Sequence, residues 1–108
     1  MVKQKINMKV YGEEVEKLIV TEKKNRLIEN TLGLVGEAGE VAEKIKKVVR
    51  DKEFSKEEVE KELGDVLFYV TALANYIGTD LQTVATINLE KLHDRRDRNK
   101  IHGSGDNR

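Results

Sequence analysis

Two pairs of acidic residues, each spaced three positions apart, are the residues of this sequence best suited to chemistry. Glu37 and Glu40 form the first pair, and Glu62 and Asp65 form the second. On a helix, residues three apart lie on one face, so each pair would present two neighbouring carboxylates. Four carboxylates brought together repel one another unless a cation lies between them, and oxygen ligands favour Mg²⁺ or Mn²⁺. The spacing therefore indicates a divalent-metal site, and metals held by carboxylates commonly bind and activate polyphosphates.

The apolar surroundings of both pairs argue against an ordinary solvated surface. Glu37 borders the apolar stripe of its segment, next to Val41 in helical projection, and Glu62 and Asp65 enter the most apolar segment of the chain. A buried carboxylate without a partner is costly, so these acids need either a cation or an Arg or Lys partner. Spacing alone supports a metal site and structural ion pairing about equally.

Four helices are expected to position these acids. Apolar residues recur at helical spacing over four segments, at about 8–20, 26–50, 55–77 and 79–98. Ser55 with Glu58 fits a capping box at the start of the third helix, and Thr79 with Gln82 is expected to start the fourth. The short turn at 51–54 makes the second and third helices antiparallel neighbours, which would let the two pairs of acids meet.

The third segment is apolar on most of its sides. From Leu63 to Ile77 its only clearly polar side chains are Asp65, Thr71 and Asn75. A helix of this kind is buried on most sides, and four short helices can hardly cover it within one subunit. We therefore expect an all-α fold, a four- to five-helix antiparallel bundle that oligomerisation completes as a homodimer or homotetramer.

Length, charge and composition narrow the class of protein further. A chain of 108 residues fits a single domain over 1–108, with 99–108 as a flexible tail. Lys plus Arg and Asp plus Glu balance at 20 each, which gives no electrostatic case for nucleic-acid binding. Cysteine is absent, which excludes a thiolate zinc site, and no apolar run approaches membrane-spanning length. We expect a soluble cytoplasmic protein with no nucleic-acid or membrane partner.

The segments that carry the acids resemble the MazG-like nucleoside triphosphate pyrophosphohydrolases, an all-α family. The family pattern is EExxE on one helix and ExxD on the next, and the matching stretches are GLVGEAGEVAEK at 33–44 and ELGDVLFY at 62–69. The stretch NLEKL at 88–92 is similar to the family's Asn-x-x-Lys segment, and the resemblance covers about 11–98. The chain departs from the pattern at Gly36, where the family has the first Glu.

What the resemblance implies is hydrolysis of a (deoxy)nucleoside triphosphate to the monophosphate and pyrophosphate. The four acids would hold Mg²⁺, for which Mn²⁺ is a possible substitute, and Glu37 or Glu40 would have to activate the attacking water. Asn88 and Lys91 would contact the nucleotide or its phosphates, in a site that could be shared between subunits. The missing acid at Gly36 keeps an alternative open, a non-catalytic helical module of the same fold that binds a nucleotide or a protein.

Three further residues are weaker candidates for substrate contact. Lys44, one turn after Glu40, suits a phosphate contact, although a simple ion pair with Glu40 is favoured. Tyr69 suits stacking on a base and packing in the core about equally. Arg95 belongs to a basic run near the end of the last helix, where it could grip the triphosphate or simply offset the helix dipole.

Overall fold

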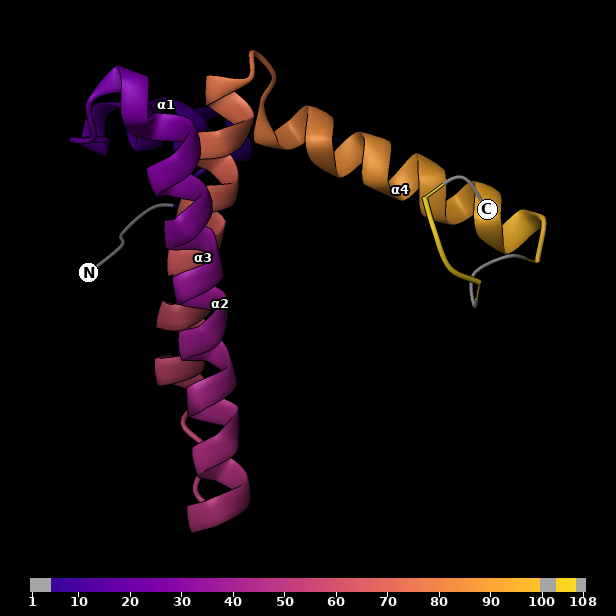
Figure 1. Ribbon diagram of the computed structural model, residues 1–108. Coiled ribbons are helices and arrows are strands. Elements are labelled where there is room, and N and C mark those ends of the chain that lie inside the picture. Colours follow the sequence, from indigo (N-terminus) through magenta and orange to yellow (C-terminus); the bar gives the residue numbers. More distant parts are fainter. Residues whose placement is uncertain (1–4, 100–102, 107–108) are drawn as a thin grey trace.

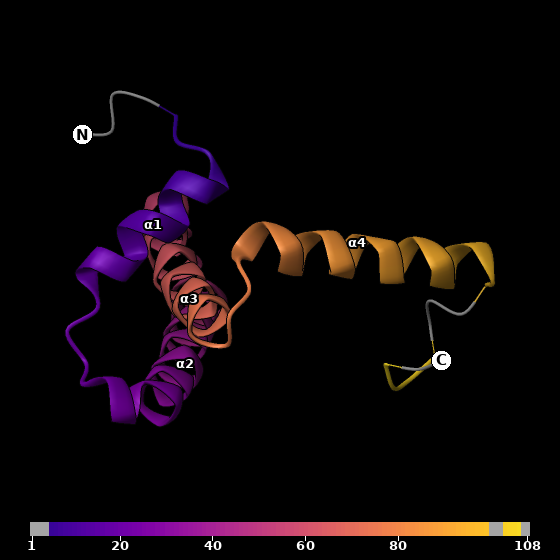
Figure 2. The same ribbon diagram turned by 90° about the horizontal axis from the view of Figure 1, so that it is seen from above.

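The computed structural model describes residues 5–99 and 103–106. The predicted all-α class is confirmed, with four α-helices and no strand in these two stretches. The helices are α1 (Met8–Leu18), α2 (Arg26–Asp51), α3 (Lys56–Tyr76) and α4 (Leu81–Asp97), and the 3₁₀ turn η1 (Lys23–Asn25) precedes α2. The long helices α2 and α3 lie antiparallel, α1 packs near the end of α3, and α4 points away from them (Figures 1 and 2).

Side-chain caps explain where the two helices after α2 begin. Ser55 accepts a hydrogen bond from the Glu58 backbone N–H at 3.2 Å, the contact predicted for the start of α3. The prediction for α4 was wrong by one residue, because Asp80 rather than Thr79 is the N-cap and accepts from the Thr83 N–H at 2.7 Å. An ionised carboxylate is a stronger acceptor than a hydroxyl, and the positive end of the helix dipole favours its charge.

Close packing between α2 and α3 sets their register. Gly33 of α2 lies against the ring of Tyr69, so closely that an added Cβ would come within 2.5 Å of ring atoms. Further along α2, Lys44 forms an ion pair with Glu58, which lies the same number of residues back along α3. Because the two contacts agree in register, α2 and α3 run alongside each other without a shift between them. The residue of α3 that lies opposite any residue of α2 can therefore be read from this register.

A single arginine, Arg26 at the start of α2, links α1 to the end of the α2–α3 pair that lies opposite the 52–55 turn. Its guanidinium donates to both carboxylate oxygens of Glu16 on α1, at 2.7 and 3.1 Å, and to the Ala72 carbonyl on α3 at 3.2 Å. It also lies 5.4 Å from the centre of the Tyr76 ring, within the range of a cation–π contact. Because the Arg26 side chain is only 11% exposed, this network links three helices with little screening by solvent.

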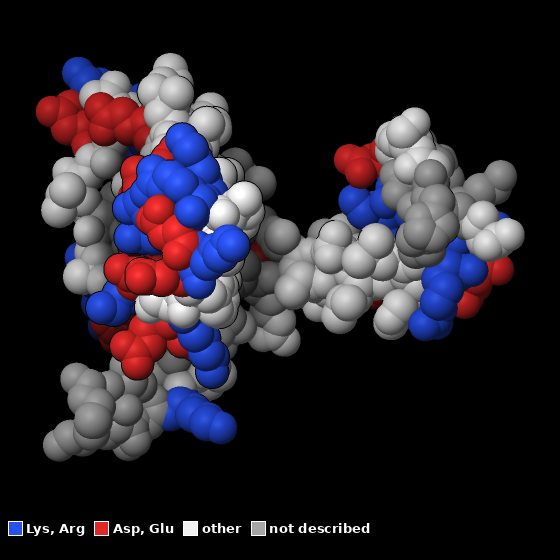
Figure 3. Space-filling model, turned by 90° about the horizontal axis from the view of Figure 1, so that it is seen from below, with Lys and Arg blue, Asp and Glu red and all other residues white. Residues whose placement is uncertain are grey.

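The remaining helix, α4, leaves much of its surface open. Leu81 is buried at its start, but large apolar side chains further along, such as Ile87 and Leu89, are exposed. Seen from the α2–α3 turn, α4 is mostly uncharged until side chains of both charges gather at its far end (Figure 3). Within one subunit the bundle therefore consists of α1, α2 and α3, and α4 lies outside it. None of the described helices is both long enough and apolar enough to cross a membrane.

Exposed apolar side chains also follow the helix pair itself. They are Leu27, Ile28, Leu32, Val35, Ile45 and Val49 on α2 and Leu63 on α3. Exposed apolar side chains that are contiguous form a surface on which another molecule can pack. The apolar character predicted for the third helical segment is thus only partly covered within the described residues of one subunit.

Candidate metal centre

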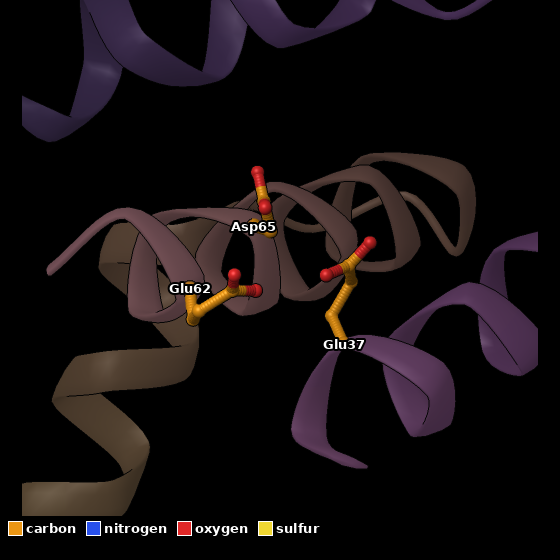
Figure 4. A group of neighbouring side chains, drawn as sticks. All are labelled: Glu37, Glu62 and Asp65. Carbon is orange, nitrogen blue, oxygen red and sulfur yellow. The ribbon is translucent and has the colours of Figure 1, made fainter. Parts of the chain in front are cut away.

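Three of the four predicted acids converge between α2 and α3. Glu37 projects from α2, Glu62 and Asp65 project from α3, and their carboxylates lie near one another (Figure 4). One carboxylate oxygen from each lies within 4.8 Å of the other two. The register explains this meeting, because one turn along α2 from Gly33 lies Glu37, and one turn back along α3 from Tyr69 lies Asp65.

The fourth acid, Glu40, lies at the edge of this group. It follows Glu37 by one turn on α2, is exposed, and is level with Glu62 in the register. Its carboxylate is not one of the three that converge, yet its charge is near enough to raise the pKa of Glu37. Glu40 therefore faces solvent beside the converging acids and can reach a molecule bound there.

The three converging carboxylates carry negative charge that no described side chain offsets with an ion pair. No ion pair in residues 5–99 and 103–106 involves Glu37, Glu62 or Asp65. Burial raises the pKa of Glu37, and the charges of Asp65, Glu62 and Glu40 raise it further. Oxygen-only donors with excess negative charge suit a hard cation such as Mg²⁺ or Mn²⁺. The spacing left two interpretations open, a metal site and structural ion pairing. The described residues show no structural ion pairing of these acids.

Tyr11 of α1 is a neighbour of this group that the sequence did not single out. Burial raises the pKa of its hydroxyl, and the nearby charge of Asp65 raises it further. Tyr11 therefore stays neutral and can donate a hydrogen bond beside the acids. Its place on the apolar face of the first helix gave no sign of this role, because only the packing of α1 on α3 brings it there.

Two of the weaker substrate candidates are engaged elsewhere on the helix pair. Lys44 forms its ion pair with Glu58, at 3.8 Å between Nζ and Oε1, and not with Glu40 as expected. Lys44 lies on the face of α2 that meets α3, directly opposite Glu58 in the register. It therefore pairs with Glu58 across the two helices and not with Glu40 on its own helix. The ring of Tyr69 packs on Gly33 between the helices.

The other three candidates, Asn88, Lys91 and Arg95, lie on the outer half of α4. Asp65 is roughly 17 Å back along α3 from its end, and Lys91 is roughly 15 Å along α4 from its start, at 1.5 Å per residue. The two helices diverge between these points (Figures 1 and 2). Within one subunit, the acids and the α4 residues therefore do not form one site.

Comparisons with known proteins identify the family of this chain. Residues 26–99 match the MazG nucleotide pyrophosphohydrolase domain, which takes in α2, α3 and α4. The chain is 52% identical over 83 residues to the Gene 37 protein of Mycobacterium phage L5, covering 72% of this chain and 73% of that protein. No solved structure shows a significant match. The resemblance found in the sequence is thus confirmed, and the chain belongs to the MazG nucleotide pyrophosphohydrolase domain family.

Proposed function

We propose that this chain is a metal-dependent nucleoside triphosphate pyrophosphohydrolase, which converts a (deoxy)nucleoside triphosphate and water to the monophosphate and pyrophosphate. The observation that carries the proposal is the convergence of Glu37, Glu62 and Asp65 in a chain of the MazG family. Carboxylates without a counter-charge destabilise a fold, so their retention favours a role in binding a cation. When bound, Mg²⁺ or Mn²⁺ would offset the charge of the triphosphate and polarise its oxygens.

In this proposal the four acids have different tasks. Glu37, Glu62 and Asp65 hold the cation, and Glu40 accepts the proton of the water that attacks the α-phosphorus. The exposure of Glu40 and its position outside the converging group support this assignment. Glu37 is the other candidate base, but it is less available because one of its oxygens belongs to that group.

We further propose that a second copy of the chain completes the site, as a homodimer or homotetramer. Asn88, Lys91 and Arg95 lie too far from the acids of their own subunit to share a nucleotide with them. The exposed apolar side chains of α2, α3 and α4 supply a surface on which copies can pack. If α4 of one copy lies across the helix pair of another, its Lys and Asn can hold phosphates and orient the departing pyrophosphate.

Pyrophosphate release from a panel of canonical and modified dNTPs and NTPs tests the reaction. Release that requires Mg²⁺ or Mn²⁺, stops in EDTA and yields the monophosphate is the expected result. Nucleotide binding without product from any member of the panel would contradict it and favour the non-catalytic module. An added Cβ at Gly36 meets no atom within 4 Å, so Gly36→Glu can show whether the missing family acid limits the rate.

A mixing experiment tests the shared site. Asp65→Asn and Lys91→Ala subunits are each expected to be inactive alone. If α4 of one copy serves the acids of another, mixed dimers contain one site with neither substitution, and about a quarter of the wild-type activity returns. If each subunit forms its own site, every site carries one substitution and the mixture stays inactive.

A further inference from the structure

Residues 103–106 lie against α4 and cover one of the candidate phosphate ligands. Between Gln82 and Asp97, every residue of α4 is exposed except Lys91 and Arg95. The Arg95 side chain is only 5% exposed, although it lies on a helix that projects away from the bundle. Within the described residues, its hydrogen-bond partners all belong to residues 103–106, which we call the strap.

The strap meets both cations with one carboxylate and two carbonyls. Arg95 Nη2 donates to the Asp106 carbonyl at 2.7 Å and to the Gly105 carbonyl at 3.3 Å, and lies 3.5 Å from Asp106 Oδ1. Lys91, one turn earlier, donates to the same Oδ1 at 3.1 Å. The hydrogen bond and charge of Lys91, followed by those of Arg95, hold the pKa of Asp106 below its usual value. Asp106 is therefore an ionised group seated on the two cations.

We propose that the strap is a displaceable cover, in which Asp106 occupies the anion position of Lys91 and Arg95 until a polyphosphate group takes its place. Carboxylate and phosphate oxygens satisfy Lys and Arg in the same way, so the two anions compete for one position. Arg95 in particular is enclosed by strap backbone, and a phosphate reaches it only after the strap has moved. The identity of the displacing ligand rests on the proposed function, whereas the contact itself does not.

Two features make the strap easy to displace. The side chain of Asp106 is 85% exposed, and ion pairs with an exposed partner are weak, whereas pyrophosphate brings several charges at once. Gly105 has φ +83°, a left-handed conformation that glycine adopts without strain and that other residues resist. Single substitutions can therefore weaken the strap, either at the Asp106 carboxylate or at the left-handed Gly105.

Binding of inorganic pyrophosphate in EDTA, measured by calorimetry, tests the competition without metal or turnover. Asp106→Asn is expected to bind pyrophosphate roughly two- to five-fold more tightly than wild type, the effect of removing competition from an exposed ion pair. Gly105→Ala, which changes no charge, is expected to shift affinity in the same direction. Asp97→Asn makes the same change of charge on α4 beside Arg96 and is expected to change affinity less. Equal affinity in all four proteins, no measurable binding, or weaker binding by Asp106→Asn would overturn the strap.

A second readout follows the strap itself by NMR. On addition of pyrophosphate, the amide signal of Gly105 is expected to move to a random-coil position, while that of Gly36 on α2 stays in place. Release of the strap without turnover of any nucleotide would leave this inference standing and remove the proposed enzyme. Metal-dependent turnover with the Gly105 signal unmoved at saturating pyrophosphate would overturn the strap alone.

Discussion

Two polar clusters on the same helix pair are built on opposite electrostatic principles. At one end, Arg26 meets Glu16 with two hydrogen bonds, and each charge has its counter-charge. About three turns along α2, Glu37 meets Glu62 and Asp65, and like charges face one another with no ion-pair partner in the described part of the chain. The first cluster can be explained by stability alone. The second gains no stability from its like charges, and the comparison teaches that missing compensation, more than the presence of charge, marks a candidate functional site.

The largest expected effect comes from the uncompensated cluster. Asp65→Asn is expected to lower the rate of pyrophosphate release by about 1,000-fold or more, because it removes one of the proposed cation ligands. The same substitution is expected to leave the melting temperature in EDTA unchanged or higher, because it removes repulsion. Glu43→Gln, on the exposed face of α2, is the matched control and is expected to keep full activity. Undiminished turnover in Asp65→Asn would contradict a functional role for the cluster of Glu37, Glu62 and Asp65.

The compensated cluster is expected to respond in the opposite way. Arg26→Met should lower the free energy of unfolding by about 2–4 kcal/mol, because it removes three hydrogen bonds from a largely buried side chain and the link from α1 to α3. Denaturant unfolding measures this loss. Arg26→Lys keeps the charge but not the two-pronged contact, and an intermediate loss is expected. A loss below about 0.5 kcal/mol in Arg26→Met would show that the network is not structural.

Adding Mg²⁺ should supply the counter-charge that the cluster of Glu37, Glu62 and Asp65 lacks. Like the Arg26–Glu16 cluster, it should then stabilise the fold. At ten times its dissociation constant, a bound cation stabilises the folded chain by about 1.4 kcal/mol. For a domain of this size we expect a rise in melting temperature of roughly 4–8 °C. Glu37→Gln should abolish the rise, and Glu16→Gln should leave it intact. An equal rise in all three proteins would place the cation elsewhere.

The smallest expected effect is the pH dependence of the compensated pair. The hydrogen bond from Arg26 lowers the pKa of Glu16 from its ordinary 4.5, so folding favours the charged form. The stabilisation is fully present above about pH 4.5 and is lost as the pH falls through the lowered pKa of the folded chain. Because the Glu16 side chain is 42% exposed, we expect only about 0.5 kcal/mol. Unfolding of wild type and Glu16→Gln between pH 3 and pH 7 measures it, and parallel curves would contradict the assignment.

Local pattern was enough to predict the helices and the acids. Helical spacing located all four helices to within a few residues, and Ser55 with Glu58 identified one start correctly. Acids three apart on neighbouring antiparallel helices predicted a meeting, and the structure brings Glu37, Glu62 and Asp65 together. These properties depend on residues close in sequence, or on one short turn, so a single chain reveals them.

Properties that depend on packing between distant segments escaped prediction. Lys44 has acids both along its helix and across it, and only the register of α2 on α3 selects Glu58. The position of Tyr11 beside Asp65 follows from the angle at which α1 crosses α3, which no spacing encodes. The direction of α4 is likewise a tertiary property. The cap at Asp80 is different, since it lay next to the predicted residue and was missed only because two adjacent residues can both cap a helix.

The contact between Gly33 and the Tyr69 ring has a consequence for the choice of ion. It holds α2 and α3 close together only one turn from Glu37 and Asp65. This uncharged contact therefore limits how far apart the carboxylates of the two helices can lie. Mg²⁺ requires ligands at about 2.0–2.1 Å, whereas Ca²⁺ accepts about 2.3–2.6 Å. A methyl group at position 33 would pry the helices apart and favour the larger ion. Selectivity for a small cation would then depend on Gly33, a residue that does not contact the cation.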